Sequence, residues 1–289
     1  MPARLILNAD DFGLSHGINR AIAELHSAGA ISSATLMAAG PAFDDAVGVA
    51  RAHPTLGVGC HIVLTDGAPV SPPGSIRSLI GADGINLRPS LVDFVQALLL
   101  GRINEEEVAH EALAQIEKLQ RAGINITHFD THKHTHLFPA IARPLLQVAD
   151  HCGIRAIRNP FEPDWSLALD HGSCARRLAI RLIGCLRPRF EAHPQLRDGR
   201  VLTTDGTAAI SATGQLDAAT LAEILRALPS MGTYELCCHP GYNDGDLDRI
   251  ATRLRAQRDI EREALLSEIP RVLAGANAPL LLHYGSLAE

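Results

Sequence analysis

Short strand-like runs alternate with helix-like segments along most of this 289-residue chain. Strand-like patterns occupy residues 4–8, 32–38, 57–64, 127–130, 153–159, 232–239 and 278–283. Helix-like patterns occupy residues 15–28, 41–53, 90–100, 104–122, 138–152, 216–228 and 246–273. Such alternation is typical of one parallel sheet with right-handed connections. We therefore predict a single-domain α/β fold over residues 1–289, an irregular (β/α) barrel of seven or eight mostly parallel strands.

Two stretches depart from this alternation. Residues 65–89 are rich in proline and glycine and predict a long loop, and the pattern also weakens over residues 160–215. We expect both stretches near the mouth of the barrel. Within the second, residues 168–190 resemble a basic amphipathic helix, whose exposed face either contacts solvent or binds a membrane or partner.

Charge and composition narrow the class of partner. The formal net charge is −6 without a run of Lys and Arg, which argues against nucleic acid and favours a small-molecule or oligosaccharide substrate. The longest apolar stretches fall far short of the roughly 20 residues that a membrane span needs. No G-x-G-x-x-G motif follows the first strand-like run, which counts against a dinucleotide fold.

The cysteines and the start of the chain indicate a cytoplasmic protein. The six cysteines are scattered without a C-x-x-C motif, so we expect reduced thiols. The opening residues enter a strand pattern without an export signal. Cys237 and Cys238 are adjacent, which favours packing at a strand end over the alternative of a redox pair. The pattern leaves open whether the chain forms a homo-oligomer.

Titratable residues stand at the end of nearly every strand-like run. They are Asp10, Asp11, His61, Asp130, His132, His134, His136, Arg155, Arg158, His239 and His283. Because the carboxyl ends of parallel strands open at one mouth, these side chains are expected to converge there. The convergence predicts a metal site. Taken singly, the Asp10–Asp11 pair also suits a turn or helix cap, and His61 also suits a core histidine.

The stretch "HFDTHKHTHLF", residues 128–138, has four histidines. In an extended chain, alternate side chains share a face, so these histidines start on one side until the strand bends near Thr131. An H-x-H pair binds one divalent ion well, and imidazoles with a carboxylate suit Zn²⁺, Mn²⁺, Fe²⁺ or Co²⁺. Spacing alone leaves two choices, His132 with His134 or one histidine with a distant partner.

Four stretches together resemble the YdjC-like carbohydrate deacetylases, the family of chitooligosaccharide deacetylase. They are "LILNADDFGLSHGIN", "GVGCHIVLTDGAPV", "THFDTHKHTHLFP" and "ELCCHPG". "SSATLMAAGPAFDDAV" and "PTLGVGCHIVL" also resemble the hopanoid-biosynthesis-associated, HpnK-like branch. Thr131 and Cys60 depart from the family pattern, where Ser, and Leu or Met, are usual.

The resemblance implies a metal-dependent hydrolase that removes an acetyl group from an N-acetylated amino sugar or glycoconjugate. It implies one divalent metal ion, Mg²⁺, Zn²⁺ or another transition metal, held by Asp11, His61 and His132. Asp10 is then the candidate general base. His134 becomes a substrate contact or a residue that supports the ligands.

The remaining roles follow from residue type and position. His239 is the candidate general acid, because histidine titrates near neutral pH, although a structural histidine before a turn is the alternative. Asp130 is expected to orient a ligand histidine. Arg155 or Arg158 would keep Asp10 ionised, with a surface role for the other.

Two other functions compete. One is another metal-dependent amidohydrolase, although that superfamily places H-x-H after the first strand and Asp after the last. The other is a non-catalytic sugar-binding or metal-binding relative, which would need neither a base nor an acid.

Overall fold

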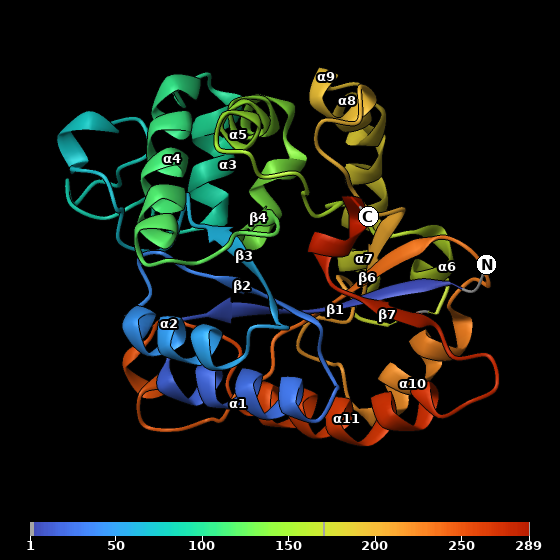
Figure 1. Cartoon of the computed structure of the whole chain (residues 1–289). Coiled ribbons are helices and arrows are strands. Elements are labelled where there is room, and N and C mark those ends of the chain that lie inside the picture. The colour runs from blue at the N-terminus through green and yellow to red at the C-terminus, as the bar shows by residue number, and fades with distance from the viewer. Residues whose placement is uncertain (1–2, 170, 289) are drawn as a thin grey trace.

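A curled, parallel sheet forms the centre of the protein in a computed structural model that describes residues 3–169 and 171–288 (Figure 1). Within these residues the strands are β1 (Arg4–Phe12), β2 (Ser33–Leu36), β3 (Gly57–Ile62), β4 (Phe129–Thr131), β5 (Gly206–Ala208), β6 (Thr233–Cys238) and β7 (Leu280–Leu282). They follow the order β4-β3-β2-β1-β6-β5, and β7 also pairs with β1. This arrangement confirms the predicted irregular (β/α) barrel.

Strand β1 is the central strand. One of its edges pairs with β6, and the other is shared by β7 along Arg4–Ile6 and by β2 beyond Asn8. Strand β7 therefore ends well below the mouth of the barrel.

The barrel is irregular where the chain was predicted to be a strand at residues 153–159. This run makes only isolated bridges, Phe129 with Ile157 and Ala156 with Leu202. Pro160 follows at once and has no N–H for a longer ladder. Strand β5, by contrast, was not predicted, because its sequence Gly-Thr-Ala contains no large apolar side chain.

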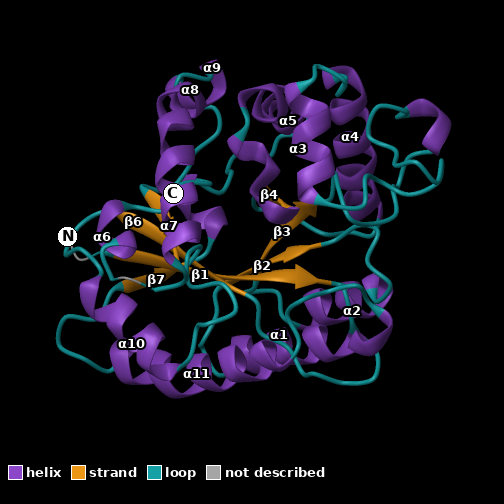
Figure 2. Cartoon of the chain, turned by 180° about the vertical axis from the view of Figure 1, so that it is seen from behind, coloured by secondary structure: helices purple, strands orange, loops and turns teal. Residues whose placement is uncertain are grey.

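Helices surround the sheet (Figure 2). The longer ones are α1 (His16–Ser27), α2 (Phe43–Ala52), α3 (Leu91–Leu99), α4 (Glu105–Arg121), α5 (Pro139–His151), α7 (Cys174–Ile183), α10 (Ala218–Ala227) and α11 (Ala256–Leu273). The short ones are α6 (Asp164–Leu167), α8 (Arg187–Glu191) and α9 (Pro194–Arg197). Helices α1, α2, α10 and α11 lie on one side of the sheet, with α3–α5, α8 and α9 opposite (Figures 1 and 2).

Local signals account for most of the helix ends. Ser15 caps α1 by accepting from the Ile18 N–H, and Asn104 caps α4 in the same way. Helix α11 starts about ten residues later than predicted, at Ala256. The preceding residues 243–248 are Asn-, Asp- and Gly-rich, and they form turns because their side chains bond to nearby backbone.

Side chains along β1 point alternately to the outside and to the inside of the barrel. Leu5, Leu7 and Ala9 point outward into the main apolar core beneath the helices. Ile6 points inward and packs with Ala156 and Tyr284 in a small apolar cluster inside the barrel. Above this cluster the interior is polar, and the candidate site lies there.

The two irregular stretches each make a contact beside the histidine-rich segment. Asp66, at the start of residues 65–89, pairs with Lys133. Phe190, within residues 160–215, packs against His136 with 6.4 Å between ring centroids. The predicted basic helix is observed as α7 followed by α8, although Asp170 lies outside the described residues. In the described chain, no helix combines the length and apolarity required to cross a bilayer.

Candidate metal and catalytic site

A bulge in β1 turns two consecutive aspartates toward the same space. The register between β1 and β2 shifts between Ala9 and Phe12, and Asp11 has a φ of 63°. In a regular strand, Asp10 and Asp11 would point to opposite faces. The bulge re-aims Asp11, so both carboxylates reach the mouth of the barrel. Both residues are about 3% exposed.

The histidine-rich segment bends at the predicted place. Strand β4 ends at Thr131, and Lys133 and His134 adopt left-handed backbone conformations, with φ of 57° and 53°. The four histidines consequently diverge. His132 faces Asp11, whereas the His136 ring is buried between the Thr131 hydroxyl and the Arg158 carbonyl oxygen.

Three donor atoms from distant parts of the chain meet at the mouth. His61 Nε2 lies 3.3 Å from His132 Nδ1 and 3.8 Å from Asp11 Oδ1, and His132 Nδ1 lies 3.6 Å from Asp11 Oδ1. Ligands about 2.0–2.2 Å from a tetrahedral ion are separated by about 3.3–3.6 Å. Two of the three separations fall within this range, and the third, 3.8 Å between His61 Nε2 and Asp11 Oδ1, is slightly longer. The three atoms are therefore close enough to share one cation.

Two observations support a cation at this position. Asp11 Oδ1 is buried and has no hydrogen-bond partner, although a buried carboxylate oxygen normally has one. His61 Nδ1 bonds to Asp130 Oδ1 at 2.7 Å, which leaves Nε2 directed at the other two donors. An imidazole pair with one carboxylate is a donor set that binds divalent transition metals.

The electric field in the site favours positive charge. Burial alone would lower the pKa of His61, but the carboxylates of Asp130, Asp10 and Asp11 outweigh burial and raise it to about 9. Burial likewise opposes ionisation of Asp11, yet the adjacent Arg258 guanidinium holds the pKa of Asp11 well below its ordinary value. Asp11 is therefore a carboxylate at neutral pH.

A buried arginine, Arg158, holds three carboxylates together at the bottom of the site. The Arg158 guanidinium is fully buried and binds both oxygens of Asp10, at 2.5 and 2.8 Å. It also forms ion pairs with Asp130 Oδ2 at 2.5 Å and with Glu235 Oε1 at 2.6 Å, and its Nε donates to Glu235 Oε1 at 2.8 Å. Burial opposes ionisation of Asp10, but Arg158 outweighs burial and keeps the pKa of Asp10 well below its ordinary value.

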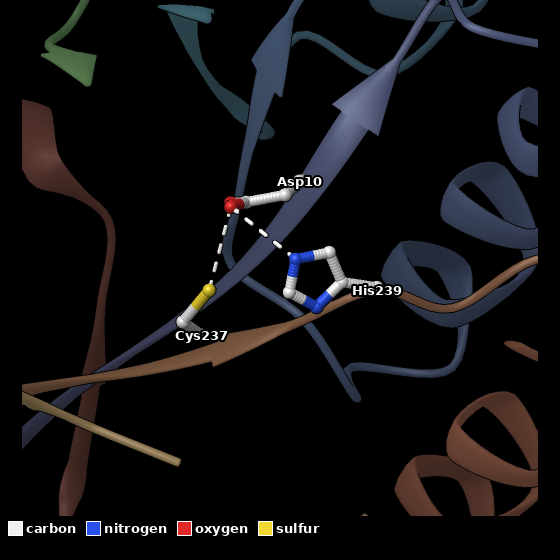
Figure 3. Close-up of side chains that lie close together, drawn as sticks. All are labelled: Asp10, Cys237 and His239. Atoms are coloured by element: carbon white, nitrogen blue, oxygen red, sulfur yellow. Dashed lines mark hydrogen bonds and ion pairs between the residues drawn. The ribbon is translucent and has the colours of Figure 1, made fainter. Parts of the chain in front are cut away.

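His239 and Cys237 approach Asp10 from β6 and the residue after it (Figure 3). His239 Nε2 lies 3.7 Å from Asp10 Oδ2, and the Cys237 thiol lies 3.4 Å from the same oxygen. The Glu261 carboxylate accepts the His239 backbone N–H at 2.6 Å and fixes the chain there. Cys238 points the other way and bonds to the Asn8 carbonyl, so strand alternation separates the two thiols.

Not every predicted residue reaches the site. Arg155 is exposed and lies outside the cluster, so Arg158 alone is the arginine beside Asp10. His283 follows β7 and bonds to Gly285 and Ser286 below the mouth. His134 stays near the site, where burial and then the Arg158 guanidinium hold its pKa well below its ordinary value. Its ring centroid lies 6.2 Å from that of His136, and its buried Nδ1 has no hydrogen-bond partner.

Several polar residues of the site were missed in the sequence. They are Asn8, Thr35, Glu235, Cys237, Arg258, Glu261 and Tyr284. Glu235 stands inside an otherwise apolar strand, and Arg258 and Glu261 stand three residues apart on the buried face of α11. A charged residue at a position where the strand or helix pattern expects an apolar one could have identified these three residues as part of a buried site.

Burial of neutral His136 should make stability depend on pH. Burial, and then repulsion from Arg158, lowers the pKa of His136 to about 3, compared with 6.5 in the unfolded chain. The unfolded chain therefore binds a proton below pH 6.5 that the folded chain does not, and stability falls as the pH falls. Between pH 7.5 and 5.5, His136 is expected to lower the free energy of unfolding by about 1.4 kcal/mol.

Urea unfolding of the native protein and of His136→Gln at both pH values measures this effect. Glutamine does not titrate, so the variant should lose about 1.4 kcal/mol less than the native protein. An equal loss in both proteins would show that His136 is not the titrating group.

Comparisons with known proteins agree with this architecture. The family model described as YdjC-like protein matches residues 4–273. A crystal structure from Enterococcus faecalis V583, named a cellobiose-phosphate cleavage protein, superposes with a TM-score of 0.78. The two sequences are 25% identical, and the superposition covers 99% of each chain.

Two curated relatives share the name carbohydrate deacetylase. The protein of Brevibacillus brevis is 41% identical over 158 residues, which are 55% of this chain and 60% of the relative. The protein of Geobacillus stearothermophilus is 39% identical over 150 residues, 52% of this chain and 57% of the relative. The chain thus matches less than two thirds of the length of these relatives.

Proposed function

The chain belongs to the YdjC-like protein family, and on that premise we propose that it is a metal-dependent hydrolase that deacetylates an N-acetylated amino sugar or glycoconjugate. The observation that carries the proposal is the meeting of Asp11, His61 and His132 beside a carboxylate and a histidine, Asp10 and His239. The name carbohydrate deacetylase, given to relatives that match about half of this chain, supports the substrate class.

Asp11 Oδ1, His61 Nε2 and His132 Nδ1 are the atoms that would hold the ion. A bound divalent ion supplies Lewis-acid chemistry, because it polarises an amide carbonyl and lowers the pKa of water. Two imidazole donors favour Zn²⁺, Mn²⁺, Fe²⁺ or Co²⁺ over Mg²⁺, which prefers oxygen ligands.

Asp10 and His239 would move the protons of the reaction. Deacetylation consumes one water, breaks the amide C–N bond, and yields acetate and a protonated amine. Asp10, ionised and held by Arg158, would accept the proton of the attacking water at Oδ2. His239 would donate a proton to the amine nitrogen as it leaves, since expulsion of an unprotonated amine is slow. The 3.7 Å between His239 Nε2 and Asp10 Oδ2 supports roles for both groups at one scissile bond.

The polar partners around Asp10 fix its direction. Arg158 binds both of its oxygens, and Asn8 Nδ2 donates to Oδ1 at 3.0 Å. The ion pair also makes Asp10 a weak base, because it stabilises the carboxylate. Such a group releases an accepted proton readily, and His239 is near enough to receive it for the next step.

Acetate release tests the proposed activity. The purified protein, with its metal content determined, is incubated with N-acetylated oligosaccharides and with acylated lipid-linked sugars. We expect acetate from one of these substrate classes, loss of release after chelation, and recovery when the metal is returned. Cleavage of unrelated amides without acetate from any sugar would identify another amidohydrolase, and sugar binding without turnover would identify a non-catalytic relative.

Asp10→Asn should separate metal binding from catalysis. Asparagine retains the shape of the side chain but cannot accept a proton, so turnover is expected to fall about 10²- to 10⁴-fold while metal content stays unchanged. The measurements are acetate release and metal content of the same preparation. Asp44→Asn, on the exposed first turn of α2, is the matched control and should retain activity. Full activity in Asp10→Asn would remove Asp10 as the base.

The proposal extends to a cytoplasmic location and a small-molecule or oligosaccharide substrate, with a lipid-linked sugar as one of the tested classes. All six cysteines are free, which suits a reducing compartment.

A further inference from the structure

Helix α7 (Cys174–Ile183) presents an apolar face to solvent. None of its residues is buried. At 3.6 residues per turn, Ala175, Leu178, Ala179 and Leu182 lie on one face, and all four are exposed. Leu178 is 59% exposed and Leu182 is 65% exposed. The exposed side of a helix on a globular protein normally carries polar residues, so this face lacks the polarity of an ordinary surface.

The surroundings of this face are positively charged. Arg176, Arg177 and Arg181 belong to α7, and Arg187 and Arg189 follow in α8, where Arg187 pairs with Glu191. The described residues 171–190 contain no aspartate or glutamate, although the whole chain has a net charge of −6. On the helix, Arg176 and Arg181 fall on opposite sides of the apolar face.

We propose that α7 is a docking surface for an anionic lipid bilayer. An apolar face bordered by arginines is the pattern of a helix that lies in the membrane interface, with its apolar side chains among the lipid chains and its cations at the headgroup phosphates. Leu178 and Leu182 enter the bilayer, and Arg181 and Arg189 contact the phosphates. The remainder of the protein stays outside, because the described chain has no helix that could span the membrane.

The size and charge of the surface favour lipid over a second copy of the chain. A stable protein interface buries about 800 Å² on each partner, far more than two leucines and two alanines offer. Two copies of this surface would also bring their arginines together. A bilayer accommodates a narrow apolar face and supplies negative charge around it. The inference depends on no part of the proposed catalytic function.

Sedimentation with vesicles tests the proposal on the full-length protein. The probes are vesicles of phosphatidylcholine alone and of phosphatidylcholine with phosphatidylglycerol, each at low and high salt. We expect binding to the anionic vesicles to be at least about tenfold stronger and to weaken with salt. Equal binding to both vesicles, or no binding, would overturn the proposal.

Substitutions on α7 and α8 test whether this surface is the one that binds the vesicles. Leu178→Glu with Leu182→Glu should weaken binding to anionic vesicles by at least about tenfold. Arg181→Gln with Arg189→Gln should reduce the preference for anionic vesicles. Circular dichroism verifies that each variant is folded.

The matched control is on α3, where Val92 is 77% exposed and Leu99 is 78% exposed. Val92→Glu with Leu99→Glu likewise replaces two exposed apolar side chains with glutamate, next to Asp93, and should leave vesicle binding unchanged. An equal loss in this control would overturn the assignment to α7. Light scattering that shows a dimer, converted to a monomer by Leu178→Glu with Leu182→Glu, would assign the face to a second copy instead.

Discussion

Replacement of Arg158 by methionine is expected to lower the free energy of unfolding by about 3–5 kcal/mol and to abolish turnover. Methionine removes the buried cation but fills much of the same space. Asp10, Asp130 and Glu235 would then lose their shared partner inside the barrel. A buried carboxylate without a counter-charge is costly, and Asp10 would also lose its two hydrogen bonds to Arg158.

Urea unfolding, with the midpoint and slope compared between proteins, measures the effect on stability. Arg155→Met is the matched control, because Arg155 lies three residues away in the same segment and is exposed. Its free energy of unfolding should change by no more than about 0.5 kcal/mol. A change below about 1 kcal/mol in Arg158→Met would mean that Arg158 does not hold the cluster together.

Arg158→Lys distinguishes charge from geometry. Lysine restores one positive charge but has no planar pair of N–H groups for the two oxygens of Asp10. We expect it to recover part of the lost stability while turnover remains low. Full recovery of turnover would show that charge alone, without the two-point contact, is sufficient for Asp10.

The second large effect is expected at His132, compared with His134 in the same segment. His132→Ala removes one of the three converging donor atoms, so the protein should lose bound metal and all measurable turnover. His134 belongs to none of the donor groups found among the described residues. His134→Ala should therefore retain a full equivalent of metal, with altered kcat or KM.

Metal analysis after dialysis, followed by acetate release from the same samples, provides both measurements. Equal loss of metal in the two variants would favour an H-x-H pair as the ligands, the other choice that spacing allowed. Retention of metal in His132→Ala would exclude the proposed ligand set, whatever the substrate.

The longer helices and most strands were predictable because their signals are local. Ser15 and Asn104 start their helices through caps that lie within three residues. Short strand-like runs located β1, β2, β3, β4, β6 and β7. The prediction failed where a strand has no large apolar side chain, as at β5, or where turn-forming side chains delay the start of a helix, as before α11.

The site was predictable only in part, for a related reason. Residues that follow strands could be nominated because parallel strands end at one mouth, and Asp10, Asp11, His61, Asp130, His132 and His239 are found together there. Arg258 and Glu261 belong to α11, whose many charged residues are typical of a helix on the protein surface. Their contacts with Asp11 and with the His239 backbone span 247 and 22 residues of sequence, and no local pattern encodes them.

Residue order and periodicity were thus sufficient for the parallel architecture and for the set of side chains near the mouth, since both depend on hydrogen-bonding and burial rules that act over a few residues. The direction of each side chain depended on the assembled barrel. The bulge that turns Asp11 beside Asp10, the left-handed turn that separates His132 from His134, and the burial of Arg158 rather than Arg155 all result from packing between distant segments. Such packing is fixed only when the whole barrel has formed, and it produces no periodic pattern in the sequence.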